Sequence, residues 1–122
     1  YTKLCENLLN FKNIKSYEYF KNLIYVVSLK YLDHNTCKLR GKWGFFYECH
    51  INNLKNISYV SSRGLQTLTY FGFTKKFLKA FFEINNFNGI DRVVPFGQAL
   101  NINLIWDGYD LTKILSREIE IR

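Results

Sequence analysis

The sequence contains no methionine, one proline, seven glycines and three cysteines, and it has no long hydrophobic run. So little proline and glycine excludes a collagen-like or linker composition. The lack of a long apolar run predicts that no transmembrane helix is present. Because neither a methionine nor a signal-peptide pattern occurs, we expect a processed product or a piece of a longer protein.

The 122 residues are 48% hydrophobic and 22% charged, which is typical of a folded domain and excludes a disordered tail. The net charge of +7 raises the question of a nucleic-acid partner. However, the charge is spread over the chain: 9 basic against 4 acidic residues in 1–61, and 8 against 6 in 62–122. The densest basic cluster, Lys75, Lys76 and Lys79, falls on one helical face, so the distribution argues against nucleic-acid binding.

The three cysteines are an odd number without regular spacing, so they do not form a disulfide framework. We expect a reducing, cytoplasmic setting. His34 and Cys37 have the only spacing typical of a zinc-ligand pair. Cys49 and His50 are neighbours in a predicted strand and therefore point to opposite faces. No metal site is predicted.

Hydrophobic spacing predicts four elements in the first half: helices over residues 2–11 and 16–22, and strands over residues 24–31 and 45–51. Ser16 is a suitable N-cap for the second helix. In the second strand, Phe45, Tyr47 and Cys49 share one face.

The second half predicts a strand bounded by Gly64 and Gly72, a helix from Thr74 to about residue 85, and a strand over residues 90–96. Strand, helix and strand in this order predict a parallel βαβ unit over residues 64–97 with a right-handed crossover. The helix has an apolar stripe of Phe77, Leu78, Phe81 and Phe82, and its water-facing side holds Lys75, Lys76, Lys79 and Glu83.

After Gly97, Asp-Gly at residues 107–108 predicts a turn, and Asp110 is a candidate cap for a short helix through residue 116. Trp106 is interpreted as a packing anchor for this segment. Residues 118–122 alternate apolar and charged, which indicates an edge strand or an interface tail.

Three motifs follow one another in the second half. They are Leu-Gln-Thr at residues 65–67 followed by Gly72, Gly-Ile-Asp-Arg-Val-Val-Pro-Phe-Gly at 89–97, and Ile-Trp-Asp-Gly-Tyr-Asp-Leu at 105–111. In order and spacing, this set resembles the C-terminal end of LuxC-type acyl-CoA reductases, which make long-chain aldehyde, notably for bacterial luciferase. The resemblance covers roughly residues 63–117.

The resemblance implies an α/β fold in which residues 1–122 are the C-terminal part of a larger, aldehyde-dehydrogenase-like catalytic domain. It implies reduction of a long-chain acyl-CoA or acyl-protein thioester by NADPH, through an acyl group carried on a cysteine. The family's nucleophilic cysteine lies in a motif upstream, and none of Cys5, Cys37 and Cys49 has that setting. The catalytic nucleophile and the main NADPH-binding domain are therefore expected in the rest of the reductase chain, and this chain alone is expected to be inactive.

Ligands of open α/β sheets bind beyond the carboxyl ends of parallel strands, here residues 70–73 and 95–98. Tyr70 and Phe96 are therefore candidate substrate-binding residues, with Phe96 lining an acyl tunnel or belonging to the core. Arg92 contacts a cofactor phosphate or forms a salt bridge with Asp91. By analogy with aldehyde dehydrogenases, Trp43 approaches the nicotinamide, although the glutamate expected in that loop is absent.

The partners implied by the resemblance are the rest of the reductase chain and the thioester substrate, and the alternating tail suggests a homo-oligomer. A non-catalytic basic binding or assembly module, with nucleic acid as one partner, is the alternative; its support is the charge of +7 and the 11 Phe, 9 Tyr and 2 Trp residues. A third interpretation is a gene remnant that makes no stable product.

Overall fold

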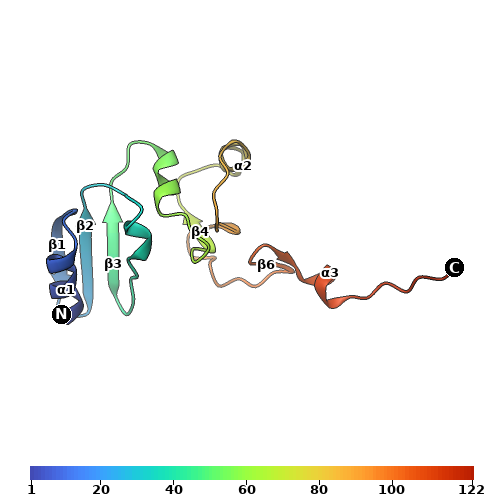
Figure 1. Ribbon diagram of the computed structural model, residues 1–122, viewed down its shortest axis with the longest axis horizontal. Coiled ribbons are helices and arrows are strands. Elements are labelled where there is room, and N and C mark those ends of the chain that lie inside the picture. Colours follow the sequence, from blue (N-terminus) through green and yellow to red (C-terminus); the bar gives the residue numbers. More distant parts are fainter. The chain divides into compact units, whose positions relative to one another are not determined.

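The computed structural model describes residues 1–122, and its contacts divide the chain into two compact units, Tyr1–Val60 and Ser61–Arg122. Each unit combines helices with small sheets (Figure 1), which confirms a mixed α/β structure. That the whole chain belongs to one larger catalytic domain stays a prediction. None of its helices has the length and apolar composition that crossing a bilayer requires.

The first unit is a helix and a three-stranded sheet. Helix α1 (Thr2–Asn10) precedes strands β1 (Ile14–Phe20), β2 (Ile24–Leu29) and β3 (Phe45–Cys49), which lie in the order β1-β2-β3. β1 and β2 are antiparallel, whereas β2 and β3 are parallel. Two short 3-10 helices, η1 (Thr36–Lys38) and η2 (Leu54–Tyr59), lie before and after β3.

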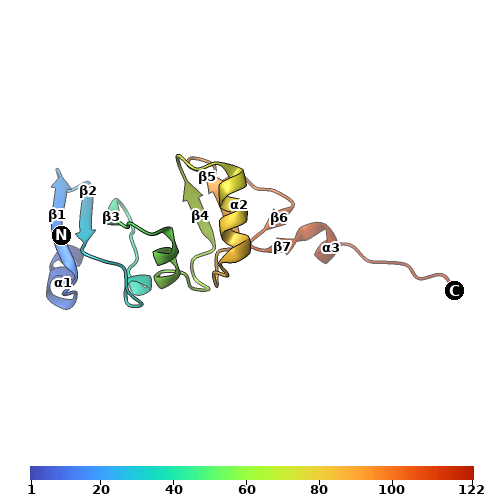
Figure 2. The same cartoon turned by 90° about the horizontal axis from the view of Figure 1, so that it is seen from above.

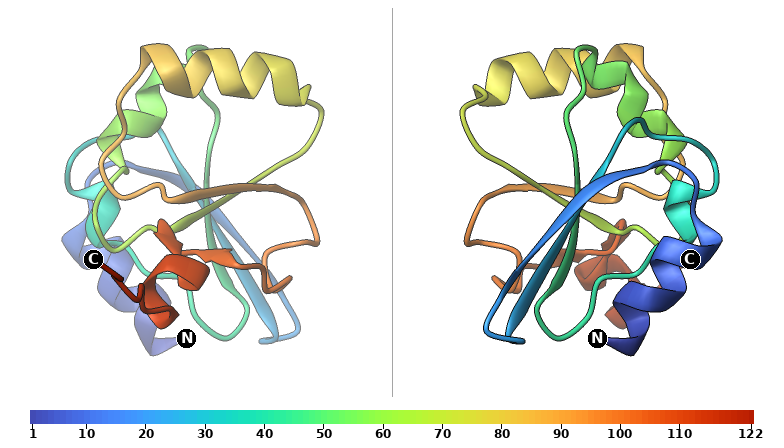
Figure 3. Two further views of the ribbon diagram at one scale, coloured as in Figure 1. Left: turned by 90° about the vertical axis from the view of Figure 1, so that its right-hand side faces the viewer. Right: turned by 90° about the vertical axis from the view of Figure 1, so that its left-hand side faces the viewer.

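Helix α1 lies beside the sheet (Figure 3), and the core of the first unit lies between this helix and one face of the sheet. Alternate residues of β2 are buried because a strand presents every second side chain to the same face. The buried cluster consists of Leu4, Tyr25, Val27, Leu29 and Phe45. Tyr25 stacks on Phe45 with 5.9 Å between ring centroids. The predicted shared face of β3 is confirmed, since Tyr47 and Cys49 pack against this cluster.

The helix predicted over residues 16–22 is wrong, because these residues belong to β1 and the turn after it. Lys21 and Asn22 both adopt positive φ, 47° and 57°, and the Leu23 amide donates to the Phe20 carbonyl at 2.9 Å. This reverses the chain so that β1 pairs with β2. Backbone hydrogen bonds to a strongly β-forming neighbour outweigh the weak helical spacing of the aromatic residues.

The second unit contains the predicted βαβ arrangement. Strand β4 (Thr67–Tyr70) and strand β5 (Arg92–Pro95) are parallel, with helix α2 (Lys75–Ile84) between them in sequence and beside them in space (Figure 2). Thr74 caps α2, since its Oγ1 accepts a hydrogen bond from the Phe77 amide at 3.2 Å. Both the parallel pairing and the cap are therefore confirmed.

The rest of the second unit is a small hairpin and a short helix. β6 (Ile105–Trp106) and β7 (Tyr109–Asp110) are joined through Asp107 and Gly108 at positive φ, which confirms the predicted turn. The Asp110 carboxylate caps α3 (Leu111–Leu115) by accepting from the amides of Thr112 and Lys113. Residues 116–122 are exposed and form no strand, so the expectation of an edge strand is wrong.

Candidate functional site

A cavity of about 510 Å³ lies between α2 and the β4–β5 pair. Its walls are mostly apolar, with two ammonium groups, one phenol and one amide among them. The lining residues are Tyr70, Lys75, Leu78, Lys79, Phe82, Ile90, Val93, Val94, Pro95 and Gln98. An apolar hollow with few polar groups is the usual form of a small-molecule site.

The helical wall of the cavity comes from one face of α2. Lys75, Leu78, Lys79 and Phe82 follow the spacing that places side chains on a single helix face. Leu78, which is 6% exposed, is the only buried residue of the helix. The prediction that Lys75 and Lys79 face water is confirmed, since both are exposed, and both also border the cavity. Their spacing from Leu78 in the sequence could have predicted that both border the cavity.

Next to the cavity-lining face, α2 carries a row of aromatic rings. Phe77 stacks on Phe73 at 5.6 Å and on Phe81 at 6.2 Å between ring centroids, and Phe81 contacts Phe87 at 5.5 Å. Phe77 nevertheless stays half-exposed. Phe82 contacts both Phe81 and Phe87. The predicted apolar stripe is therefore continuous, with Leu78 and Phe82 toward the cavity.

Tyr70 and Phe96 lie where the parallel strands end. Tyr70 is the last residue of β4 and lines the cavity, and its carbonyl accepts the Phe96 amide at 2.8 Å. The Phe96 side chain is 77% exposed and is not among the lining residues. Its interpretation as a core residue is therefore wrong. Gln98, from the same predicted site mouth, does line the cavity.

Arg92 is held by neighbouring backbone. Its guanidinium donates to the carbonyls of Ala99 at 2.7 Å and Asn101, and lies 4.6 Å from the Trp106 ring centroid. The expected salt bridge with Asp91 is not formed, since the ion pairs of the chain are Lys79–Glu83 and Glu120–Arg122. Arg92 therefore joins β5 to the loop after it and to β6, and its contact with Trp106 gives that ring the expected anchoring role.

Trp43 belongs to the first unit, in the turn before β3. It adopts φ of 52° and its side chain is 98% exposed. Gly44, the next residue, adopts φ of 80° and approaches the Leu23 carbonyl so closely that an added Cβ would lie 2.2 Å from its oxygen. The turn exposes the Trp43 indole to solvent. The other predicted site residues all belong to the second unit.

The unit that contains the cavity has no cysteine. All three cysteines of the chain are free and belong to the first unit. Burial raises the pKa of the Cys49 thiol, which lowers its thiolate fraction at neutral pH. The Cys37 thiol donates to the His34 carbonyl at 2.9 Å. No group of three or more His, Cys, Asp or Glu side chains is placed to hold a metal ion.

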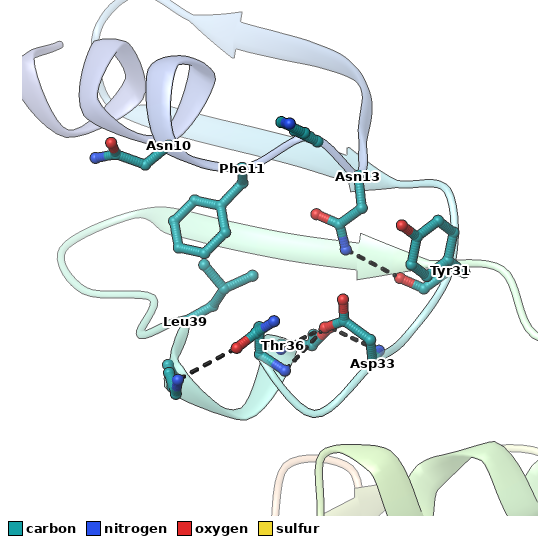
Figure 4. A pocket seen from close by; sticks show the side chains of 10 residues that line it. Asn10, Phe11, Asn13, Tyr31, Asp33, Thr36 and Leu39 are labelled. Atoms are coloured by element: carbon teal, nitrogen blue, oxygen red, sulfur yellow. Dashed lines mark hydrogen bonds between the residues drawn. The ribbon is translucent and has the colours of Figure 1, made fainter.

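A second hollow, of about 460 Å³, lies in the first unit between the end of α1 and η1 (Figure 4). Phe11 and Leu39 point toward each other at its wall, and the buried Asn13 donates to the Tyr31 carbonyl at 3.3 Å. At its edge the Asp33 carboxylate accepts hydrogen bonds from the Thr36 hydroxyl and amide, both at 2.9 Å. These bonds fix the start of η1.

The hydrogen bond from the Thr36 hydroxyl is the main cause that lowers the pKa of Asp33 below its ordinary value of 3.8. A lowered folded-state pKa stabilises the fold above the ordinary value, and this contribution is lost as pH falls through the folded value. We therefore expect the amide signals of Asn35 and Thr36 to shift together in an acid NMR titration with a midpoint below pH 3.8. Thr36→Val should move the midpoint upward; an unchanged midpoint would contradict the assigned cause.

Comparison of the chain with protein-family models, curated proteins and solved structures found no match. The candidate site therefore rests on its geometry and on the motifs of the sequence.

Proposed function

We propose that this chain is the C-terminal part of a LuxC-type, aldehyde-dehydrogenase-like reductase that converts a long-chain acyl thioester to an aldehyde with NADPH. The observation that carries the proposal is the order of the three motifs, combined with the parallel pairing of β4 and β5 to which the first two belong. The first motif leads into β4, the second contains β5, and the third contains the β6–β7 hairpin. All three motifs therefore lie in the second folded unit.

The proposed role of the chain is to bind the acyl group in the cavity beside α2. Leu78, Phe82 and Val93 are among the apolar residues that line it, and burying an alkyl chain there would stabilise the complex by about 0.8 kcal/mol per CH₂. Lys75 and Lys79 suit an acyl group attached to an anionic carrier. The Tyr70 hydroxyl and the Gln98 amide are the remaining polar groups.

The covalent chemistry is assigned to the upstream part of the reductase. A cysteine thiolate there attacks the thioester carbonyl and forms a new carbon–sulfur bond, while the carbon–sulfur bond of the substrate breaks and the carrier leaves as its thiolate. NADPH, when bound, supplies the hydride for the reduction. Arg92 is engaged by carbonyl groups and Trp43 is a lone exposed ring, so these two residues do not form a built cofactor site.

The test uses a full-length protein that carries this segment, assayed for NADPH oxidation with a long-chain acyl-CoA. Absence of thioester reduction would refute the proposal. Val93→Phe, which narrows the cavity, should lower the rate with a long-chain thioester several-fold relative to a short-chain one. Thr69→Phe adds the same kind of side chain at an exposed position of β4 and should leave that ratio unchanged. If Val93→Phe and Thr69→Phe give the same ratio of long-chain to short-chain rates, the cavity does not bind the acyl group.

A further inference from the structure

Four cationic side chains line one hollow of the first unit. This basic hollow has a volume of about 350 Å³ and lies between α1 and the segment that leads from η1 to β3. Its charged lining residues are Lys3, Lys38, Arg40, Lys42 and Glu6, so the cations outnumber the carboxylates by three. None of these cations has an ion-pair partner, because the chain's ion pairs involve Lys79 and Arg122.

Three of the cations are held in place before any ligand binds. The Lys38 ammonium donates to the Asn35 side-chain oxygen at 3.2 Å. The Lys3 ammonium donates to the Arg40 carbonyl and lies 4.8 Å from the Phe45 ring centroid. The Arg40 guanidinium donates to the carbonyls of Cys37 and Leu39. Fixed side chains lose less entropy on binding, so a ligand that meets them binds more tightly than it would to mobile lysines. The Lys42 ammonium has no hydrogen bond or ion pair, so it is free to reach a ligand, while the Lys42 carbonyl accepts from the Phe45 amide at 3.0 Å.

The basic hollow shares part of its wall with the second hollow of the unit, shown in Figure 4, whose charged lining residues are Lys12, Lys38 and Asp33. Asn10, Phe11, Lys38 and Leu39 line both. Phe11 and the Asn10 amide thus offer an aromatic face and a polar group next to the cations. A ligand with a strongly anionic group and an adjoining uncharged ring system matches this arrangement.

We propose that the basic hollow binds a diphosphate group. Several cations around one concave surface raise the local concentration of a polyanion, and a diphosphate presents enough oxygens to contact more than one of them. Mutual repulsion of the unpaired cations is relieved when the anion binds. This inference does not depend on the reductase proposal, since the observations that carry it all belong to the other unit.

The proposal is tested by titrating inorganic pyrophosphate into the full chain at 0.15 M salt and following the amide NMR shifts of the protein. Saturable shifts should be concentrated at residues 38–42 and in the first turn of α1. Arg40→Gln and Lys42→Gln should each weaken binding about fivefold. Lys55→Gln removes the same charge from an exposed position outside the hollow and should change the affinity less than about twofold. Circular dichroism establishes that each variant is folded.

Two further probes identify the source of the diphosphate. ADP that binds more tightly than pyrophosphate identifies a nucleotide, with the neighbouring hollow taking the base, whereas ADP that binds less tightly identifies free diphosphate. Adenosine alone should not bind. The proposal is overturned by shifts that do not saturate, by equal weakening in Lys55→Gln, or by adenosine binding as tightly as ADP.

Discussion

Gly89→Ala should destabilise the second unit by about 3 kcal/mol or more. Gly89 adopts φ of 88°, a conformation that disfavours any residue with a Cβ. An added Cβ would also lie 1.9 Å from the Ser62 carbonyl oxygen, and this neighbour is backbone that cannot rotate away. The Ser61 hydroxyl, next to Ser62, donates to the Asn88 carbonyl. To make room for the added Cβ, the segments around residues 61–62 and 88–89 would have to separate. Urea unfolding followed by Trp106 fluorescence measures the loss.

Gly97→Ala is the matched control for this prediction. Gly97 has nearly the same φ, 86°, but no atom lies within 4 Å of the position that its Cβ would occupy. Its substitution should therefore cost only the backbone strain of the left-handed conformation, about 1–2 kcal/mol. If the two variants unfold at the same urea concentration, close packing against residue 62 is not the reason why glycine is required at residue 89.

Leu4→Ala should cost the first unit about 2–5 kcal/mol, the range for removing a buried leucine side chain. Leu4 is 3% exposed and is the residue through which α1 joins the buried cluster of the sheet. Its truncation leaves a cavity against Val27 and Tyr25. Chemical denaturation and hydrogen exchange of the β2 amides both report the loss, since those amides depend on the helix that covers the sheet.

Leu9→Ala removes the same atoms from the same helix, but Leu9 is 85% exposed. We expect a change within about 0.5 kcal/mol. A Leu4→Ala variant as stable as Leu9→Ala would show that α1 does not cover the sheet in solution. Because α1 has no side-chain cap at its start, its stability depends on this packing more than on local signals.

The elements predicted well from sequence are those with a local cause. Thr74 caps α2, Asp110 caps α3, and Asp107 with Gly108 forms the turn, all through atoms only a few residues apart. β1 was missed because its side chains are almost all exposed, so no hydrophobic alternation marks it. Its conformation depends on pairing with β2 and on a turn whose residues, Lys21 and Asn22, carry no glycine signal.

The candidate site was predictable only in part. Tyr70 follows from the rule that ligands bind at the carboxyl ends of parallel strands. Lys79 is exposed as predicted, but its charge gave no sign that it also borders the cavity. The Arg92 guanidinium donates to the backbone carbonyls of Gln98, Ala99 and Asn101. Such partners cannot be predicted from residue types, because every residue has a backbone carbonyl. The basic hollow was missed for a similar reason, because it brings Lys3 of α1 together with cations more than thirty residues away.

The sheet of the first unit joins two kinds of pairing with very different loop lengths. β1 and β2 meet across a tight turn at Phe20 and Ile24, whereas the parallel partner of β2 begins only at Phe45. Closing the longer loop costs more chain entropy, so the hairpin is expected to form first and to provide the edge on which β3 is added. During refolding, amides of residues 19–25 should therefore gain protection from exchange earlier than those of residues 45–49.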